Sequence, residues 1–512
     1  MPHKPKKADD LVLRDYKNKA NHVLRLISEK KDVFWSSARE RVPLELFHLV
    51  ARRVPAYKDF LRKNKIAPEK IKTFKDLQLV PPVSKKNYLR EYGIEKLCWD
   101  GSLKKPLVWT STSGSTGEPF YFPRSEKLDW QASVVHDLFF RNGSLGVEGP
   151  TLVIVGFGMG VWIGGLITYE AFEMASREAG HEISILTTGI NKAEILKAFK
   201  KLSPRFRQTI LVGYPPFIKD VLDDAHSHGI GIKKLNLRLI FAAEPFTEKF
   251  RDFIVKKAHI RSSYLDTMNI YGTADLGAMA HETPLAILVR RLAVRNKKLF
   301  EAFFPSISKT PTLTQYNPLF VNFEAVDGNL LITGDSAIPL VRYSIGDHGG
   351  VFTFGEAMGA LKKFRVNAGR AIRQAGIEEH THELPFVYVY ERSDFSTNFY
   401  GIQIYPEMVR DALIDKYVSK FLTGRFTMLT KFNDDQDQYL EINLELRKEK
   451  KTHPYLKRRV LKKIVATLRE KSSEFRELSN YLEDRSHPRL IFWQNEHPLY
   501  FRPGVKQKWV KT

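Results

Sequence analysis

Hydrophobic and polar positions change their spacing along the chain. Up to about residue 100, apolar residues recur at helical intervals, which predicts helices over 14–30, 43–53 and 84–92. From about 107 to 275, short apolar runs alternate with amphipathic segments, and this alternation predicts a largely parallel sheet with helices between its strands. The expected strands are 152–157, 182–186, 209–212 and 237–242, and helices are expected over 192–201 and 216–226.

Short strands punctuated by glycines follow. Apolar runs at 320–325, 329–333 and 340–343 predict strands. Residues 355–383 are rich in Gly, Lys and Arg and give no assignment. A further strand is expected at 386–390, before a smaller α+β block that runs to the C-terminus. The pattern therefore predicts an α/β protein with a domain boundary near 392–395.

Composition narrows the range of partners. The net charge of +23 favours an anionic partner such as a nucleotide, a nucleic acid, an acidic substrate or a membrane surface. We expect no specific nucleic acid, because no Arg/Gly-rich tail or compact nucleic-acid motif is visible. Residues 152–169 carry no charge and are nearly long enough to cross a membrane, but they read better as a strand, a glycine turn and a helix.

Cysteine usage excludes several classes of site. Cys98 is the only cysteine, so disulfides, Cys-based zinc sites and iron–sulfur clusters cannot form within one chain. A cytoplasmic location is compatible with this and is expected, and no signal peptide is expected at the N-terminus. The oligomeric state is not predicted.

Residues 110–119 combine hydroxyls and glycines so densely that little apolar surface is left to bury. Glycines let backbone N–H groups turn toward an anion, and Ser and Thr hydroxyls add donors. Alone, such a run is more typical of a plain loop, and it lacks the lysine of a P-loop. Its interpretation depends on the segments that follow.

Strand-end carboxylates supply the further signals. A strand ends at Glu244, a second leads through a glycine turn to Asp275, and a third ends at Asp347. In parallel sheets, ligands bind where the carboxyl ends of strands gather. With a distant lysine, Lys506, such a set could hold a nucleotide, chelate Mg²⁺ and neutralise a developing phosphate charge.

In this order, the segments resemble the motifs of the adenylate-forming superfamily, and within it the phenylacetate–CoA ligase-like, CapK-like branch. The resemblance spans roughly residues 80–510, and six motifs in one order make it specific. Residues 113–117 resemble the phosphate loop, 164–165 with 189–191 the substrate-domain core, and 243–245 an Ala-Glu-Pro motif. Residues 271–275 resemble a Tyr-Gly-x-Ser/Thr-Glu motif, 339–347 a Pro-x-x-Arg-Tyr-x-x-Gly-Asp motif, and 390–406 the hinge.

The resemblance implies a two-domain architecture. The large N-terminal domain, 1–391, would hold a helical lead-in over about 1–100, mixed parallel sheets flanked by helices, and a small β-barrel-like subdomain. The small C-terminal domain, 392–512, would be mobile and α+β. Its movement would place a lysine at the site for the first reaction and withdraw it for the second.

The implied activity is ATP-dependent activation of a small carboxylic acid through an acyl-adenylate, with Mg²⁺, followed by transfer to an acceptor. Asp347 would bind the ribose hydroxyls, Asp275 would bind Mg²⁺, and Lys506 or the nearby Lys508 would reach the reacting groups. The full set is Lys506 and Arg342 for catalysis; Thr112, Ser113, Gly114, Ser115, Thr116, Gly117, Glu244, Pro245, Tyr271, Gly272, Thr273, Asp347 and Arg392 for the nucleotide; Asp394 as hinge; and Asp275 for the metal.

Several residues depart from the family pattern, and others could belong either to an acyl pocket or to the core. Asp275 replaces the usual glutamate, Glu118 stands where many relatives carry lysine, and 285–318 is an extra basic and aromatic stretch. A group of residues could line an acyl pocket, although each is more typical of core: His136, Phe139, Phe140, Phe157 and Trp162.

The acceptor is not specified by these motifs. CoA is the first expectation. The alternatives are a protein, a carrier thiol, an amine or a sugar, in polysaccharide or natural-product biosynthesis. A third alternative is a catalytically inactive homologue that only binds, for example, an anionic polymer. The intact 113–117 loop, Arg342 and Asp347 favour an enzyme.

Overall fold

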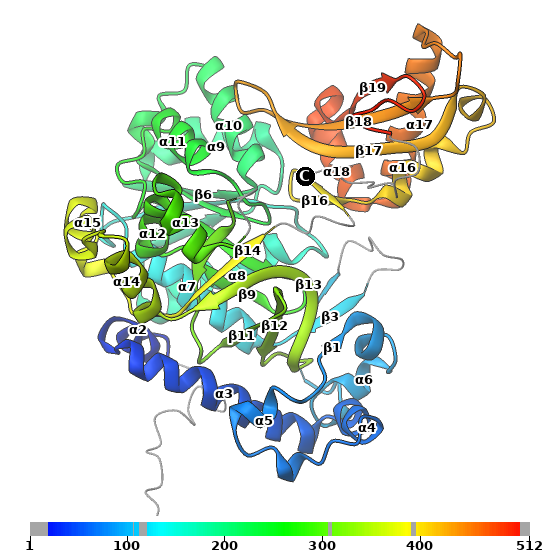
Figure 1. The fold of residues 1–512 in the computed structure, drawn as a ribbon. Helices are drawn as coiled ribbons and strands as arrows, with labels where there is room; N and C mark the ends of the chain where they lie inside the picture. Colours follow the sequence, from blue (N-terminus) through cyan, green and yellow to red (C-terminus); the bar gives the residue numbers. More distant parts are fainter. Residues whose placement is uncertain (1–18, 106, 112–119, 306–309, 391–395, 502–512) are drawn as a thin grey trace, which may run out of the picture.

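The computed structural model describes residues 19–105, 107–111, 120–305, 310–390 and 396–501 (Figure 1). Among these residues, a 12-stranded sheet organises the large part of the molecule. One half of the sheet is parallel and the other half is antiparallel, and the two halves are continuous. The chain therefore has the expected α/β fold. Where a small β-barrel-like subdomain was expected, the antiparallel strands continue the parallel sheet.

The parallel half has the strand order β5-β4-β6-β7-β8. Its strands are β4 (Thr151–Gly156), β5 (Ile183–Leu186), β6 (Gln208–Gly213), β7 (Leu237–Ala242) and β8 (Thr267–Thr273), and its helices are α7 (Glu126–Arg141), α8 (Ile163–Ala179), α9 (Lys192–Lys201), α10 (Pro215–Ser227) and α11 (Glu248–Lys257). Successive residues of β4 face opposite sides: Leu152 packs with α9–α11, and Val153 packs with α7 and α8. Helices on both faces explain why these strands are apolar throughout.

The antiparallel half continues from β8 in the order β9-β10-β14-β13-β12-β11. Its strands are β9 (Gly277–His281), β10 (Thr312–Gln315), β11 (Val321–Val326), β12 (Asn329–Gly334), β13 (Leu340–Phe352) and β14 (Phe386–Tyr390). The short strand β1 (Val83–Ser84) pairs in parallel with β13. This pairing brings the N-terminal helical part to the strand that carries Asp347.

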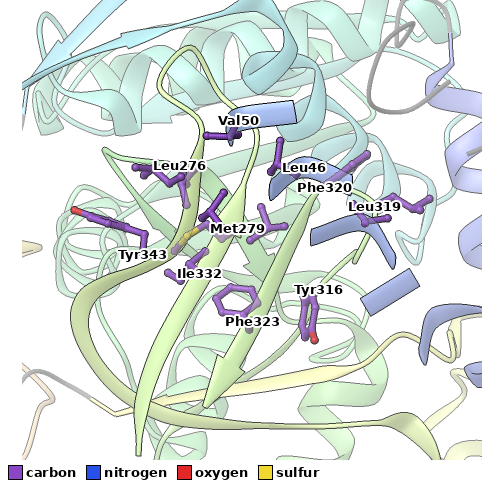
Figure 2. Close-up of a cluster of buried hydrophobic side chains, with 14 of the residues drawn as sticks. Leu46, Val50, Leu276, Met279, Tyr316, Leu319, Phe320, Phe323, Ile332 and Tyr343 are labelled. Atoms are coloured by element: carbon purple, nitrogen blue, oxygen red, sulfur yellow. The ribbon is translucent and has the colours of Figure 1, made fainter. Parts of the chain in front are cut away.

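The N-terminal helices cover the antiparallel half. They are α2 (Ala20–Glu29), α3 (Asp32–Arg53), α4 (Pro55–Lys63), α5 (Phe74–Leu77) and α6 (Ile94–Leu97). Figure 2 shows Leu46 and Val50 of α3 beside Leu276, Met279 and Ile332, all in one buried cluster. The helix expected over 84–92 is a short π-helical turn, Lys85–Leu89, which Ser84 caps.

Four more helices fill the stretches that were extra or gave no assignment. They are α12 (Pro284–Arg295), α13 (Lys297–Phe303), α14 (Phe354–Lys363) and α15 (Ala368–Ala375). Leu285, Phe303 and Leu361 pack with aromatic side chains of β13 and β14. These segments therefore build an outer layer on the antiparallel half.

A small α+β part follows residue 396 and lies beside the parallel half, drawn in yellow to red (Figure 1). It contains β15 (Thr397–Phe399), β16 (Ile402–Ile404), α16 (Pro406–Leu413), β17 (Leu422–Phe432), β18 (Gln438–Leu446), α17 (Pro454–Lys471), α18 (Ser473–Leu482) and β19 (Arg489–Trp493). We call it the small domain. Strands β17 and β18 are antiparallel, and β19 joins β18 in parallel. The boundary expected at 392–395 lies outside the described residues.

Residues 152–169 divide as the sequence predicted. They form β4, a turn, and the start of α8. No helix among the described residues is both long and apolar enough to span a bilayer.

Candidate active site

A cavity of about 600 Å³ lies where the carboxyl ends of the parallel strands meet the small domain. The large domain lines it with the ends of β7 and β8 and with part of β13. The small domain lines it with residues of β15, β17 and α18. Seven residues expected from the sequence motifs line this one cavity: Glu244, Pro245, Tyr271, Gly272, Thr273, Asp275 and Asp347.

Tyr271 and Asp347 come from different strands and meet in this cavity. The Tyr271 hydroxyl donates to Asp347 Oδ2 at 2.5 Å, and Asp347 is buried. Strand β13 adopts a positive φ of 88° at Gly346, a conformation that glycine reaches without strain. This turn and the tyrosine together fix the direction of a carboxylate that can accept two hydrogen bonds from a ligand's hydroxyls.

Asp275 forms a second polar group in the lining of the cavity. The Tyr343 hydroxyl donates to Asp275 Oδ2 at 2.5 Å, and Lys85 Nζ lies 3.8 Å from Oδ1. Mg²⁺ is usually bound by one or two carboxylates together with phosphate oxygens and water, so a single carboxylate fits a metal that arrives with a nucleotide.

The described residues contain one group of three close carboxylates, and it lies elsewhere. Asp220, Asp223 and Asp437 approach one another, but Lys219 and Arg485 pair with them. These cations already neutralise the carboxylates, so this group does not compete with Asp275 as the metal site.

Glu244 joins the two domains. Its Oε1 accepts the backbone N–H of Gly401, and its Oε2 accepts from Gln438 Nε2 at 3.0 Å. The family resemblance assigns Glu244 to nucleotide binding, and the structure adds that its carboxylate binds the small domain. The contact is closely fitted, because a Cβ on Gly401 would lie 2.3 Å from the Tyr214 ring.

Asn269 and Lys85 also line the cavity, and sequence reasoning missed both. Asn269 Nδ2 donates to the main-chain oxygen of Glu244 at 3.2 Å, while its buried Oδ1 has no partner. Asn269 lies two residues before Tyr271 on β8, so the alternation of strand faces could have indicated it. Lys85 directly follows the two-residue strand β1, too short to be seen in the sequence pattern.

The expected phosphate loop lies between two paired strands. These are β2 (Val108–Ser111) and β3 (Tyr121–Arg124), and Ser111 at the end of β2 lines the cavity. The loop residues themselves lie outside the described residues. The same is true of Arg392, Asp394, Lys506 and Lys508.

Arg342 does not line the cavity, contrary to the position expected for a catalytic residue. Its guanidinium donates to the main-chain oxygens of Gln78, at 2.6 Å, and of Val80, and to Glu324 Oε1 at 3.1 Å. Its backbone φ is +50°, beside a register shift between β12 and β13. Such a bulge turns the side chain away from the face that strict alternation would give. In this arrangement Arg342 ties the N-terminal part to the sheet.

The acyl-pocket candidates separate into two groups. His136, Phe157 and Trp162 line the cavity, whereas Phe139 and Phe140 belong to the buried core. The structure thus brings three of the five sequence candidates to the site.

His136 has a defined proton position. Its Nδ1 lies 2.7 Å from the main-chain oxygen of Ala132, which can only accept, so Nδ1 carries the proton. The buried Nε2 has no partner and is left as an acceptor. Burial lowers the pKa of His136 to about 4, so the ring is neutral at physiological pH.

Polar contacts hold the small domain against the large one. The Tyr400 hydroxyl donates to Asp220 Oδ2 at 2.9 Å, and Arg485 donates to Asp220 Oδ1 at 2.5 Å. Asn398 Nδ2 donates to the main-chain oxygen of Ala243 at 2.9 Å. Burial raises the pKa of Asp220 to about 6, and the charge of Arg485 opposes that shift. These contacts set the arrangement in which Gly401 reaches Glu244.

Comparison of this sequence and structure with known proteins identifies the fold. No family model matches the sequence, and no curated protein matches it. A solved structure of 2-hydroxyisobutyryl-CoA ligase, with 2-HIB-AMP and CoA in the thioesterification state, has a TM-score of 0.60 at 14% identity, covering 95% of this chain and 91% of that one. The same ligase in the postadenylation state, with 2-HIB-AMP, has a TM-score of 0.52 at 13% identity and the same coverage. The chain therefore has the fold of an adenylate-forming ligase, as the order of its motifs led us to expect.

Proposed function

We propose that this protein activates a carboxylic acid with ATP, forming an acyl-adenylate and pyrophosphate, and then transfers the acyl group to an acceptor. The observation that carries the proposal is the single cavity that gathers Asn269, Tyr271, Asp275 and Asp347. The solved ligase of the same fold, in complex with an acyl-AMP and CoA, supports it.

Each polar group has a part in binding the nucleotide. Asp347, held by Tyr271, accepts hydrogen bonds from the two ribose hydroxyls. The unpartnered Asn269 Oδ1 accepts from the amino group of adenine. Asp275 would hold Mg²⁺, which lowers the cost of bringing anionic groups together at the phosphates.

The reaction then needs an attacking carboxylate in line with the leaving pyrophosphate. One oxygen of the acid forms a bond to the α-phosphorus, and the bond from that phosphorus to the bridging oxygen breaks. Following the family resemblance, Lys506 is the lysine that stabilises the charge in this step, with Lys508 as the nearest alternative. Arg342 is proposed here as a residue that supports the fold.

The acid's body occupies the part of the cavity lined by Phe157, Trp162 and Ile167. His136 also lines the cavity, and its Nε2 can only accept a hydrogen bond. The preferred acid is therefore apolar with one hydroxyl or N–H group that donates to His136, since an unpaired buried acceptor is costly.

The domain arrangement fits the transfer half of the reaction. The same ligase matches this chain better in its thioesterification state than in its postadenylation state. CoA is the acceptor first expected from the sequence. The direct test of the whole proposal is acid-dependent exchange of pyrophosphate into ATP, and loss of that exchange in Asp347→Ala.

A further inference from the structure

Glu474 is a carboxylate of the small domain that lines the same cavity as the nucleotide residues. It lies in the first turn of α18 and is half-buried. The other cavity-lining carboxylates have partners: Tyr271 binds Asp347, Tyr343 binds Asp275, and Gly401 binds Glu244. Among the described residues, Glu474 has neither a hydrogen bond nor an ion pair, so the N-terminal end of α18 is the group that offsets its charge at the cavity.

The surroundings of Glu474 are negative or neutral. Glu477 lies one turn further along α18 and also has no partner among the described residues. From the large domain, the neutral Tyr214 senses Glu474: burial raises the pKa of Tyr214, and the charge of Glu474 raises it further. Glu244 adds a third negative charge near Tyr214. Glu474 lines the cavity and Glu477 adds negative charge from the next turn of α18, so a cationic ligand would supply the ion pair that the described residues do not.

The ionisation of Glu474 suits proton transfer at neutral pH. Burial raises the pKa of Glu474 to about 7, and the charge of Glu477 contributes to the shift. Burial also raises the pKa of Glu477. A carboxylate with a pKa near the working pH both accepts and releases a proton readily.

We propose that Glu474, with Glu477 behind it on α18, forms the acceptor subsite for a primary amine, and that Glu474 removes the proton from that amine during acyl transfer. The inference rests on the proposed acyl-adenylate chemistry and names its acceptor. The amine arrives as an ammonium ion, which the two carboxylates attract. A thiol such as that of CoA brings no positive charge to this subsite.

Acyl transfer to the amine conserves atoms and charge. The ammonium gives one proton to Glu474 and becomes a neutral amine. Its nitrogen lone pair forms a bond to the acyl carbon, the bond from that carbon to the AMP oxygen breaks, and AMP leaves with the electron pair. The new amide nitrogen loses its second proton to solvent. The products are an amide, AMP and two protons.

Because Glu474 belongs to the small domain, it reaches the cavity only when that domain is docked for acyl transfer. Helix α18 lies in the domain whose hairpin brings Gly401 to Glu244, so the same arrangement delivers the base. ATP and the acid are both anions, and a fixed negative charge beside them would oppose their binding. A carboxylate that arrives with the small domain avoids that repulsion during adenylation.

The first experiment compares transfer with adenylation in the full-length protein. Amide formation from propylamine and thioester formation from CoA are followed by mass spectrometry, using the acid that gives the fastest pyrophosphate exchange. We expect wild-type protein to favour propylamine. Glu474→Gln should lower the ratio of amide formation to exchange by about 100-fold, the usual worth of a general base. It should also remove the loss of transfer rate that wild-type protein shows below about pH 7.

The control is Glu470→Gln, an exposed glutamate on α17 that does not line the cavity and should leave the ratio unchanged. A wild-type ratio in Glu474→Gln, or a preference for CoA that this variant keeps, would overturn the proposal.

A second experiment measures amine binding without any reaction. Saturation-transfer NMR with propylamine should show binding to the wild-type protein and its loss in the Glu474→Gln/Glu477→Gln double variant. If exchange fails with every acid, the proposed function is wrong, and this binding result alone decides whether the amine subsite exists. No saturation transfer in wild-type protein would contradict the subsite directly.

Discussion

The backbone N–H of Gly401 donates to the carboxylate of Glu244, across the boundary between the small and the large domain. Gly401 has a φ of +78° and its Cα faces the Tyr214 ring, so no larger residue fits there. The motif glutamate of the large domain thus serves as the docking point for the small domain. In the proposed reaction, this contact links adenylation to transfer.

Gly401→Ala should separate the two half-reactions. The added Cβ would lie 2.3 Å from the Tyr214 ring, which prevents the docked arrangement. The ratio of acyl transfer to pyrophosphate exchange should fall by at least about tenfold, equivalent to about 1.4 kcal/mol of lost docking. Gly424→Ala is the matched control, because Gly424 also has a positive φ, +85°, but no atom lies within 4 Å of the added Cβ. Equal ratios in the two variants would refute the docking role.

Tyr271→Phe should weaken ATP binding without unfolding the protein. It removes the hydrogen bond that orients Asp347, and a bond to a charged group contributes about 1.5–3 kcal/mol. The dissociation constant for ATP, measured by calorimetry, should rise by about tenfold or more. Asp347→Ala should abolish binding. An unchanged affinity in Tyr271→Phe would show that the tyrosine does not position the carboxylate.

His136→Phe should change acid preference. The variant keeps an aromatic ring against Phe172 but lacks the unpartnered Nε2. Acids with a hydroxyl or N–H on the apolar body should lose about 1–3 kcal/mol of discrimination over analogues without that group. Exchange rates for matched acid pairs measure this difference. The same preference in wild type and variant would place the donor elsewhere.

Arg342→Ala should destabilise the protein rather than act on the chemistry alone. It leaves Glu324 buried without its cation, and burial already raises the pKa of Glu324. Breaking such a pair costs about 3–5 kcal/mol, which denaturant unfolding would reveal. Arg370→Ala, an exposed residue on α15, is the control. A variant of full stability that has lost exchange would restore the catalytic role expected from the sequence.

The buried His382 gives a pH dependence of known sign. Burial lowers the pKa of His382 to about 4, and neither ring nitrogen has a partner. Below about pH 6.5 the unfolded chain binds a proton here that the folded protein does not, so stability falls with pH down to about 4. His382→Phe removes this term. Relative to wild type, its melting temperature should therefore rise as pH is lowered from 7 to 5, and a constant difference would contradict the assignment.

Local patterns predicted the elements that have a continuous apolar run or a clear amphipathic period. The strands at 237–242 and 386–390 and the helix at 192–201 have the predicted bounds. The strand ends that carry Glu244, Tyr271 and Asp347 were identified for the same reason, since each follows a clear apolar run. Glu244 and Tyr271 converge because β7 and β8 are parallel neighbours, whereas Asp347 reaches the cavity from the antiparallel half.

The residues that escaped prediction depend on contacts distant in sequence. Arg342 turns away from the site because of a bulge against β12, which its own segment does not reveal. Lys85 meets Asp275 only because β1 pairs with β13. The sequence does not distinguish Glu474 from other helical glutamates, because its place beside Tyr214 in the cavity depends on how the two domains pack. Such relationships need the tertiary structure.

The most direct measurement is exchange of labelled pyrophosphate into ATP across a panel of carboxylic acids, with and without an acceptor. We expect exchange that requires one class of acid, that is absent in Asp347→Ala, and that does not require the acceptor. No exchange with any acid, together with no ATP binding by calorimetry, would contradict the central claim.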